Sequence, residues 1–585
     1  MASVFVFSVP PSCGNQEETK QESETKKTEV KAAEKKEDAV DEQAVEQARI
    51  ESRDFVRRLQ EQAFRDQKSA LGYWGVDPEN YFGWKSHSNR MIPVYTYGTK
   101  GAGSGVDLSS WTGDKSVYRS EAGLARIYGY VPEHTVDPSA TWMDQTNIYD
   151  LQMEGIAAGK KYVFLVIFDG MDWQSTQAAG IYNSGRVYTE GKGHGTFFQE
   201  YEAGGTAQFG WMVTSPHNDG TDIDPSTQTV VNPGGKTRGG YHSAVAGATP
   251  WSRPGDLGYM IGKPAEGNPT HAYTDSSSSA CSMTAGAKLF NGAINVDPSG
   301  SPIMTIAHRL QDEGISVGAI SSVPISHATP AAAYAHNVSR DDYQDLTRDM
   351  LGLPSVQHPK MPLSGLDVVI GGGWGVIKKD GKDQGDNFVP GNVFLTDADL
   401  RAVDIRHGGK YVTAVREPGK NGRDLLAAAA RDAVHGKHRL LGFFGNGAYN
   451  GHLPFATADG QFDPVEGVNK KREKYRPADI FENPTLSQMT EAGIEVLSQN
   501  PKGFWLLVEP GDVDWANHDD NVDASIGAVN SGDAAVRVIA EWVERNSNWQ
   551  ESLMIVTADH GHLFNLERPE LLLRSSHPES TDQGN

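Results

Sequence analysis

Short, unbroken apolar runs recur along the chain from residue 161 onward, at residues 161–168, 315–322, 366–373, 439–445, 503–509 and 552–561. Runs of this kind are typical of strands buried on both faces of a parallel sheet. Between them lie segments with apolar residues at helical spacing. These residues are Leu486, Met489, Val496 and Leu497 in one segment and Val536, Ile539 and Val543 in another. The alternation predicts an α/β fold, with a mostly parallel central sheet and helices on both faces.

The chain before residue 161 has a different character. Residues 16–41 are nearly all Glu, Lys, Gln, Thr and Ala, which indicates a solvated linker. Residues 42–69 favour a helix, and residues 70–160 predict ordered loops and short elements. We therefore predict three regions: a linker and helix (1–69), an N-terminal extension (70–160) and a main domain (161–585). A Gly-, Asn- and Pro-rich stretch at about 181–270 is interpreted as an insertion in the main domain.

The N-terminus carries a weak targeting pattern. An apolar run from Val4 to Val9 is followed by Pro-Pro-Ser-Cys, which resembles a secretory signal that ends at a lipid-modified Cys13. An ordinary unstructured terminus is the alternative interpretation. The two cysteines, Cys13 and Cys281, do not make a disulfide framework.

The formal net charge of −23 argues against nucleic-acid binding, which requires a basic face. It does not exclude a phosphate substrate, because bound metal ions reverse the local field.

Several acidic residues and a histidine stand at or just beyond the predicted strand ends: Asp169, Glu509, Asp514, Asp559 and His560. Ligands bind at the carboxyl ends of the strands in such sheets. One carboxylate there is usually a turn former. Several carboxylates with interleaved histidines are better explained as metal ligands.

Two further patterns carry chemistry. Ser276 opens a serine-rich run that continues into a helix-like segment, and a serine at a helix N-terminus faces free amides and the positive end of the dipole. Such runs also occur in linkers. Asp514 and His518 are spaced i,i+4, which on a helix places both on one face and suits one metal ion, although helix capping also explains the spacing.

Five motifs together resemble those of the alkaline phosphatase family, in the same order. They are VIFDGMD (166–172), the TDS run that contains Ser276, SHATPAAAYAHNVSR (326–340), VEPGDVDWANH (508–518) and VTADHGH (556–562). The resemblance covers roughly residues 161–575 and identifies the main domain as an alkaline phosphatase-like catalytic domain.

The resemblance implies a role for each matching residue. Ser276 matches the serine that becomes phosphorylated, and Arg340 matches the arginine that clamps two phosphate oxygens. The remaining matches are metal ligands: Asp169, Asp559 and His560 for one Zn²⁺, Asp514 and His518 for a second Zn²⁺, and Thr329 and Glu509, together with Asp169, for a Mg²⁺ site.

Two departures from the family pattern matter. His327 stands where many bacterial members carry Asp. We expect it beside the third metal site, where it leaves the identity of the metal ion open. In the family, a third histidine ligand of the second zinc follows well after the Asp-His strand, with a final strand and helix. Only His562, which matches a supporting histidine, and His577, which lies in another context, follow here. We therefore expect an incomplete C-terminus and weak binding of zinc by Asp514 and His518 alone.

The resemblance implies metal-dependent hydrolysis of small phosphate monoesters through a phosphoserine, in the periplasm or outside the cell, by a homodimer. Two alternatives remain: a phosphodiesterase or sulfatase of the same superfamily, and a catalytically silent metal-binding homologue that lacks the third histidine.

Overall fold

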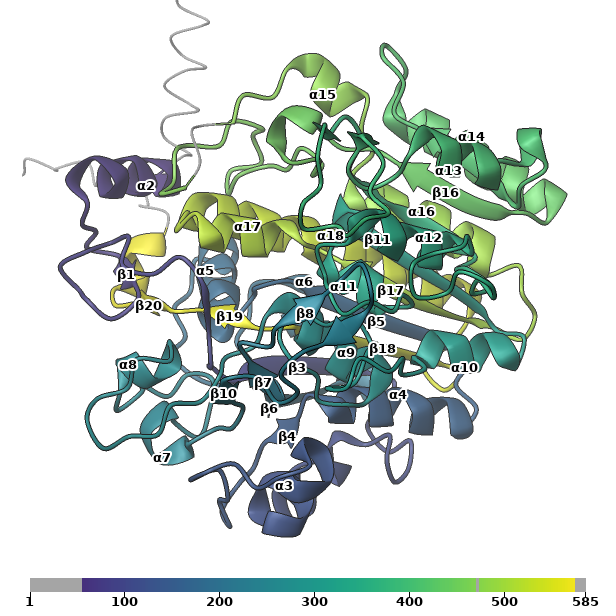
Figure 1. Ribbon diagram of the computed structural model, residues 1–585. Coiled ribbons are helices and arrows are strands. Elements are labelled where there is room, and N and C mark those ends of the chain that lie inside the picture. The colour runs from purple at the N-terminus through teal and green to yellow at the C-terminus, as the bar shows by residue number, and fades with distance from the viewer. Residues whose placement is uncertain (1–54, 470–472, 574–585) are drawn as a thin grey trace, which may run out of the picture. The chain divides into compact units, whose positions relative to one another are not determined.

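The computed structural model describes residues 55–469 and 473–573 (Figure 1). Cys13, the apolar run before it and the linker at 16–41 lie outside the described residues. Of the helix expected within 42–69, the described part is α2 (Phe55–Asp66), which buries Val56.

Ten strands form the central sheet, in the order β15-β16-β12-β11-β17-β5-β18-β3-β6-β4. Their bounds are β15 Tyr411–Val415, β16 Arg439–Phe443, β12 Val368–Gly372, β11 Ser316–Pro324, β17 Phe504–Glu509, β5 Tyr162–Phe168, β18 Ser552–Ala558, β3 Ile92–Tyr97, β6 Gln208–Val213 and β4 Met143–Asp144.

The six apolar runs are the six parallel strands from β16 to β18, as predicted. Each is buried over nearly its whole length, because the sheet is flanked by helices (Figure 1). Both predicted helices are also present. They are α16 (Leu486–Leu497), which packs on β11 and β12, and α18 (Val522–Asn546), which packs on α16 and on α5 (Trp173–Ser184).

Residues 70–160 contain more regular structure than their pattern indicated. Strand β3 pairs antiparallel with β18, and β6, from the stretch interpreted as an insertion, pairs with the other side of β3. Helix α4 (Thr146–Ala157) packs against α9 (Ser276–Ala285). A segment from early in the chain therefore builds part of the same sheet and covers a helix of the main domain.

The register of the three central strands fixes where the site lies. β5 is parallel to both β17 and β18, with Val166 opposite Val508 and Phe168 opposite Ala558. The residues at these strand ends are Asp169, Glu509 and Asp559. Because parallel strands end at the same edge of a sheet, their three carboxylates are brought together there.

Candidate metal centre

Ser276 is the first residue of α9, and the helix is capped in front of it. The Asp275 side chain accepts a hydrogen bond from the Ser278 backbone N–H at 3.0 Å, as is typical of an N-cap. Ser276 itself is buried, and its hydroxyl faces the sheet edge rather than solvent. The serine thus lies where the helix dipole and free amides favour a bound anion.

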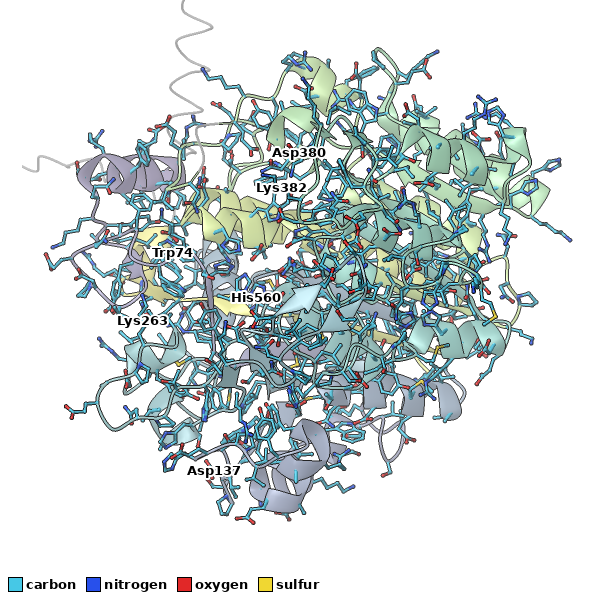
Figure 2. The ribbon with its side chains drawn as sticks, in the orientation of Figure 1. Trp74, Asp137, Lys263, Asp380, Lys382 and His560 are labelled. Atoms are coloured by element: carbon cyan, nitrogen blue, oxygen red, sulfur yellow. The ribbon has the colours of Figure 1, made fainter. Side chains whose placement is uncertain are left out.

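Four side-chain atoms converge at this point; we call Ser276, Asp169, Asp559 and His560 the serine cluster. Ser276 Oγ lies 3.1 Å from His560 Nε2 and 3.3 Å from Asp169 Oδ1. His560 Nε2 lies 3.3 Å from both Asp169 Oδ1 and Asp559 Oδ2. His560 immediately precedes β19 (Gly561–His562), beside which it is labelled in Figure 2.

These separations fit a tetrahedral zinc site. Ligand atoms at about 2.0–2.2 Å from zinc are separated from one another by about 3.3–3.6 Å. The charges fit as well. Burial, together with the neighbouring carboxylates, raises the pKa of Asp169 well above its usual range, and burial and Asp169 do the same for Asp559. A cation would stabilise both as carboxylates.

A second group of atoms lies on the other side of Asp169; we call Asp169, His327, Thr329 and Glu509 the carboxylate cluster. One ligand atom each from Asp169, His327 and Glu509 lies within 4.8 Å of the others. Among the described residues, Asp169 Oδ2, Thr329 Oγ1, Glu509 Oε1 and His327 Nδ1 are buried and make no hydrogen bond. Burial raises the pKa of Glu509 to about 8.

Buried polar atoms without partners are rare in proteins, so this arrangement also fits a cation. His327 is placed by α11 (Ala328–Ala332), which begins directly after it and carries Thr329. Its unpaired nitrogen is thus held beside the carboxylates, and its place at the edge of a third metal site stays a prediction.

A third group surrounds α17 (Asp512–His518); we call Asp514, His518 and His87 the histidine cluster. The helix places Asp514 and His518 on one face, with Asp514 Oδ1 at 3.4 Å from His518 Nε2. His87 Nε2 lies 3.2 Å from His518 Nε2 and 3.7 Å from Asp514 Oδ1. His562 Nε2 is hydrogen-bonded to Asp514 Oδ1 at 2.8 Å.

The apolar pattern gave no indication of His87, which lies in β2 (His87–Ser88), within the N-terminal extension. The expectation that Asp514 and His518 would stand alone is therefore corrected: a third histidine faces them, from before the parallel strands rather than after them. The residues around His87 carried no signal for this contact, which depends on the pairing of β2 with β19.

Arg340 is held by the helix cap in front of Ser276. Its Nη1 donates a hydrogen bond to Asp275 Oδ2 at 2.9 Å, an ion pair that is mostly buried. The charge of Asp275 raises the pKa of Arg340 further, against the effect of burial, and that of Arg340 helps to hold the pKa of Asp275 below its usual value. The guanidinium is thus held by Asp275, the residue directly before Ser276 in the sequence.

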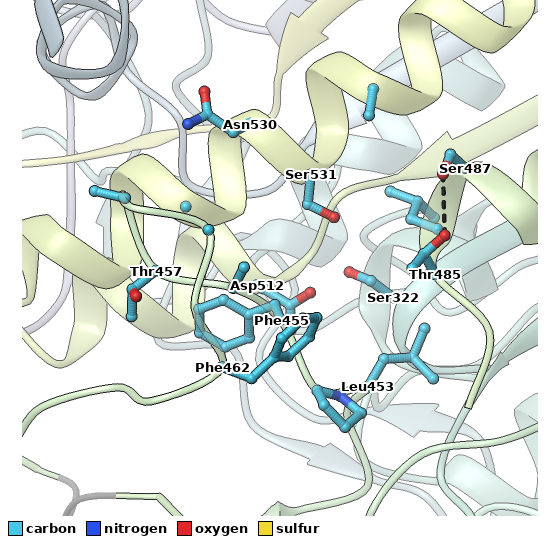
Figure 3. Close-up of a pocket in the computed structure, with 17 residues that line it drawn as sticks. Ser322, Leu453, Phe455, Thr457, Phe462, Thr485, Ser487, Asp512, Asn530 and Ser531 are labelled. Carbon is cyan, nitrogen blue, oxygen red and sulfur yellow. Dashed lines mark hydrogen bonds between the residues drawn. The ribbon is translucent and has the colours of Figure 1, made fainter. Parts of the chain in front are cut away.

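A cavity of about 270 Å³ opens elsewhere, between the segment 453–462 and α18 (Figure 3). Leu453, Phe455, Ser322 and Asp512 are among its lining residues. Its lining includes no member of the three clusters, so we do not assign a substrate to it.

Comparison with known proteins places the chain in a family. A family model described as alkaline phosphatase matches residues 259–575, more than half of the chain. The chain is 32% identical over 301 residues to an alkaline phosphatase of Escherichia fergusonii, covering 51% of this chain and 60% of that protein. It is 32% identical over 303 residues to alkaline phosphatase H of Pseudomonas aeruginosa, covering 51% and 59%. The chain therefore belongs to the alkaline phosphatase family.

Among solved structures, a cold-active alkaline phosphatase from a psychrophilic Shewanella is similar with a TM-score of 0.40 and 22% identity, covering 68% of each chain. The chain spans about 50–60% of the length of the curated relatives it matches. Metal dependence of this family agrees with the three clusters, which supply ligand-type side chains at one sheet edge.

Proposed function

We propose that the protein hydrolyses phosphate monoesters and releases inorganic phosphate, with Ser276 as the nucleophile. One observation carries the proposal: the Ser276 hydroxyl is part of a four-atom, metal-type cluster at a helix N-terminus. A nucleophilic hydroxyl needs help to lose its proton and an environment that accepts an anion, and this position offers both.

The donor sets suggest the metal ions. The serine and histidine clusters combine carboxylates with imidazole nitrogens, which suits zinc, whereas the carboxylate cluster is mostly oxygen and suits magnesium. A bound zinc ion lowers the pKa of an attached hydroxyl group and stabilises negative charge on phosphoryl oxygens.

The protein side chains position the phosphoryl group for two displacements. In the first, Ser276 Oγ forms a bond to phosphorus and gives up its proton to solvent, while the bond from phosphorus to the alcohol oxygen breaks and the alcohol departs from the opposite side with a proton from solvent. In the second, water attacks phosphorus and gives up a proton to solvent, the bond from phosphorus to Ser276 Oγ breaks, and Ser276 Oγ takes up a proton from solvent. The N-terminal amides of α9 and the guanidinium of Arg340 are placed to bind the phosphoryl oxygens.

Arg340 also favours monoesters over diesters. In the described contacts, the Arg340 guanidinium donates one hydrogen bond, from Nη1 to Asp275. Its other N–H groups remain for a ligand. A monoester dianion offers more charged oxygens to that guanidinium than a diester or a sulfate monoester does. A phosphodiesterase or sulfatase of the same superfamily is therefore the second candidate. The third is a silent metal-binding homologue.

The deciding experiment compares hydrolysis of p-nitrophenyl phosphate, bis-p-nitrophenyl phosphate and p-nitrophenyl sulfate at alkaline pH, with zinc and magnesium. We expect the monoester to be the fastest substrate, with turnover that is lost on chelation and regained when the metals are restored. A faster diester or sulfate would reassign the substrate. No turnover in a protein that holds its metals would support the silent homologue.

Location and assembly are also proposals, made from the family resemblance: action in the periplasm or outside the cell, and a homodimer. Among the described helices, none combines the length and apolar character needed to cross a membrane. A lipid anchor at Cys13 stays a prediction, since that residue lies outside the described part of the chain.

A further inference from the structure

The position of His87 is fixed by strand pairing with the site. β2 pairs antiparallel with β19, so that His87 lies opposite His562 and Ser88 opposite Gly561. The Ser88 hydroxyl donates to the Gly561 carbonyl at 3.2 Å. The His87 side chain is only 11% exposed. His87 is therefore built into the site rather than resting on its surface.

The hydrogen bonds of the Nδ1 atoms of His87 and His518 show which ring nitrogens carry protons. His87 Nδ1 lies 3.0 Å from the Thr274 carbonyl oxygen, and His518 Nδ1 lies 2.6 Å from the Lys85 carbonyl oxygen. A carbonyl oxygen only accepts hydrogen bonds, so each Nδ1 carries the proton. In the neutral rings, both Nε2 atoms then present unshared pairs.

Those two Nε2 atoms face each other at 3.2 Å, with Asp514 Oδ1 as a third acceptor at 3.4 and 3.7 Å. Three acceptors pointing at one another repel unless a cation lies between them. These separations lie within about 0.1 Å of the range of about 3.3–3.6 Å expected between ligands of a tetrahedral zinc ion. A carbonyl bonded to the far nitrogen is also the usual way in which proteins orient a metal-binding imidazole.

His562 lies beside the histidine cluster and has a different role. Its Nε2 lies 2.8 Å from Asp514 Oδ1, so this nitrogen donates a proton to the carboxylate and has no unshared pair to offer there. His562 therefore positions Asp514. His518, with a side chain that is 35% exposed, marks the open side of the cluster, as a catalytic zinc site with three protein ligands requires.

We propose that His87 is the third protein ligand of the metal ion held by Asp514 and His518. Residues 84–157 would then supply the third histidine, the strand and the helix that the family resemblance places after the Asp-His strand. This inference rests on the proposed function for the presence of the metal. The same segment supplies β3, which pairs with β18, and α4, which covers α9.

A second set of contacts ties this segment to the serine cluster. Gln145, just before α4, donates through Nε2 to Ser279 Oγ at 2.6 Å and to the Asp559 carbonyl at 2.9 Å. Gln152 in α4 donates to the Met283 carbonyl at 3.0 Å. Residues 84–157 therefore contact both the histidine cluster and the serine cluster. Under this proposal, the third histidine and its strand and helix come earlier in the chain than the family resemblance implies.

The test is a metal count on the full chain, made by mass spectrometry after equilibration with zinc and repeated as a cobalt(II) absorption spectrum. The variants are His87→Ala and His87→Gln, in which the Gln amide keeps a donor for the Thr274 carbonyl. His562→Gln tests the supporting role, and His407→Ala, an exposed histidine in a 3₁₀ turn, is the matched control.

We expect both His87 variants to bind one metal ion fewer per chain than the wild type and to lose part of the tetrahedral cobalt absorption. His562→Gln should keep the full count with 10–100-fold weaker affinity, about the effect of removing an outer partner. The control should be unchanged. Melting curves in chelator, equal for wild type and His87→Gln, would show that the variant folds.

A full metal count and an unchanged cobalt spectrum in both His87 variants would overturn the inference, as would loss of the ion in His562→Gln alone. Wild-type turnover is a separate readout. A wild type that binds all its ions without hydrolysing a phosphate monoester would refute the proposed function and leave the role of His87 standing.

Discussion

The serine cluster and the histidine cluster lie side by side but are assembled differently. The serine cluster takes Asp169, Asp559 and His560 from the ends of adjacent parallel strands and Ser276 from one helix start, and all four side chains are buried. The histidine cluster joins a short helix to a two-residue strand 431 residues away in sequence, and it is partly open to solvent.

This difference separates two ways of building a site. A sheet edge gathers the residues that follow its strands, so the geometry of the serine cluster is a direct result of strand register. The histidine cluster depends on a remote segment docking correctly. We expect the serine cluster to resist perturbation and the histidine cluster to respond to changes in the N-terminal extension.

The largest expected effect comes from Ser276→Ala, which removes the nucleophile from the serine cluster. Turnover of p-nitrophenyl phosphate should fall by at least about 10³-fold, with no phosphoserine in acid-quenched samples examined by mass spectrometry. Ser282→Ala is the control, because that hydroxyl is bonded only to the Ser278 carbonyl within the helix in the described contacts. Unchanged turnover of Ser276→Ala would remove the serine cluster from the chemistry.

Graded chelation should distinguish the two clusters by affinity. The histidine cluster has one carboxylate and an exposed side, so its ion should leave first and take the turnover with it. The ion of the serine cluster, held by two buried carboxylates, should leave later with a fall in melting temperature. A site filled at 100 times its Kd contributes about 2.7 kcal/mol to folding stability.

The measurement is metal content, turnover and melting temperature at each chelator concentration, with His518→Ala as the reference that lacks the first ion. Simultaneous loss of both ions, or a melting temperature that does not change, would contradict the contrast between the clusters.

Thr329→Val tests the carboxylate cluster, which shares Asp169 with the serine cluster. The substitution removes an unpartnered buried hydroxyl at nearly constant shape. We expect about 10-fold lower turnover at limiting magnesium, recovered in part at high magnesium, since the effect is on ion binding. Thr490→Val, whose hydroxyl is bonded to the Leu486 carbonyl within α16, should leave the magnesium dependence unchanged.

Gln145→Ala has the smallest expected effect and tests whether the serine cluster also depends on the N-terminal extension. Loss of the amide leaves the Asp559 carbonyl and the Ser279 hydroxyl with fewer partners and should cost about 1–3 kcal/mol of stability. We expect turnover to fall as well, because Asp559 is a cluster member.

The matched variant is Gln152→Ala, from the same segment. Its amide is bonded to the Ile148 and Met283 carbonyls and not to the cluster, so it should lower the unfolding temperature while turnover is kept. Equal effects of both variants on turnover would show that the segment acts only through general stability.

The sequence predicted those parts of the molecule whose signal is local. Six strands were recognisable as continuous apolar runs, because burial on both faces leaves no polar positions. Asp169, Glu509 and Asp559 were recognisable because they end such runs. Strand β3 was not, since Pro93 within Ile92–Tyr97 argues against a central strand.

In the structure, Pro93 pairs with Trp211 of β6, whereas the pairing of β3 with β18 begins only at Val94. The Pro93 carbonyl accepts a hydrogen bond from the Thr557 hydroxyl at 2.9 Å. The missing amide donor is thus tolerated. His87 escaped prediction for another reason: nothing near it in sequence shows that it meets His518, because that contact is made only when β2 pairs with β19.

The position of β18 has a consequence for how the chain folds during synthesis. β18 lies between β5 and β3, which leave the ribosome 390 or more residues earlier. At a synthesis rate of about 5–20 residues per second, each of these two strands keeps an unpaired edge for roughly 20 s or longer, and unpaired strand edges are prone to aggregate. The strand that joins them is synthesised last and carries the Asp-His pair, so the sheet and the candidate metal centre are completed in the same late step.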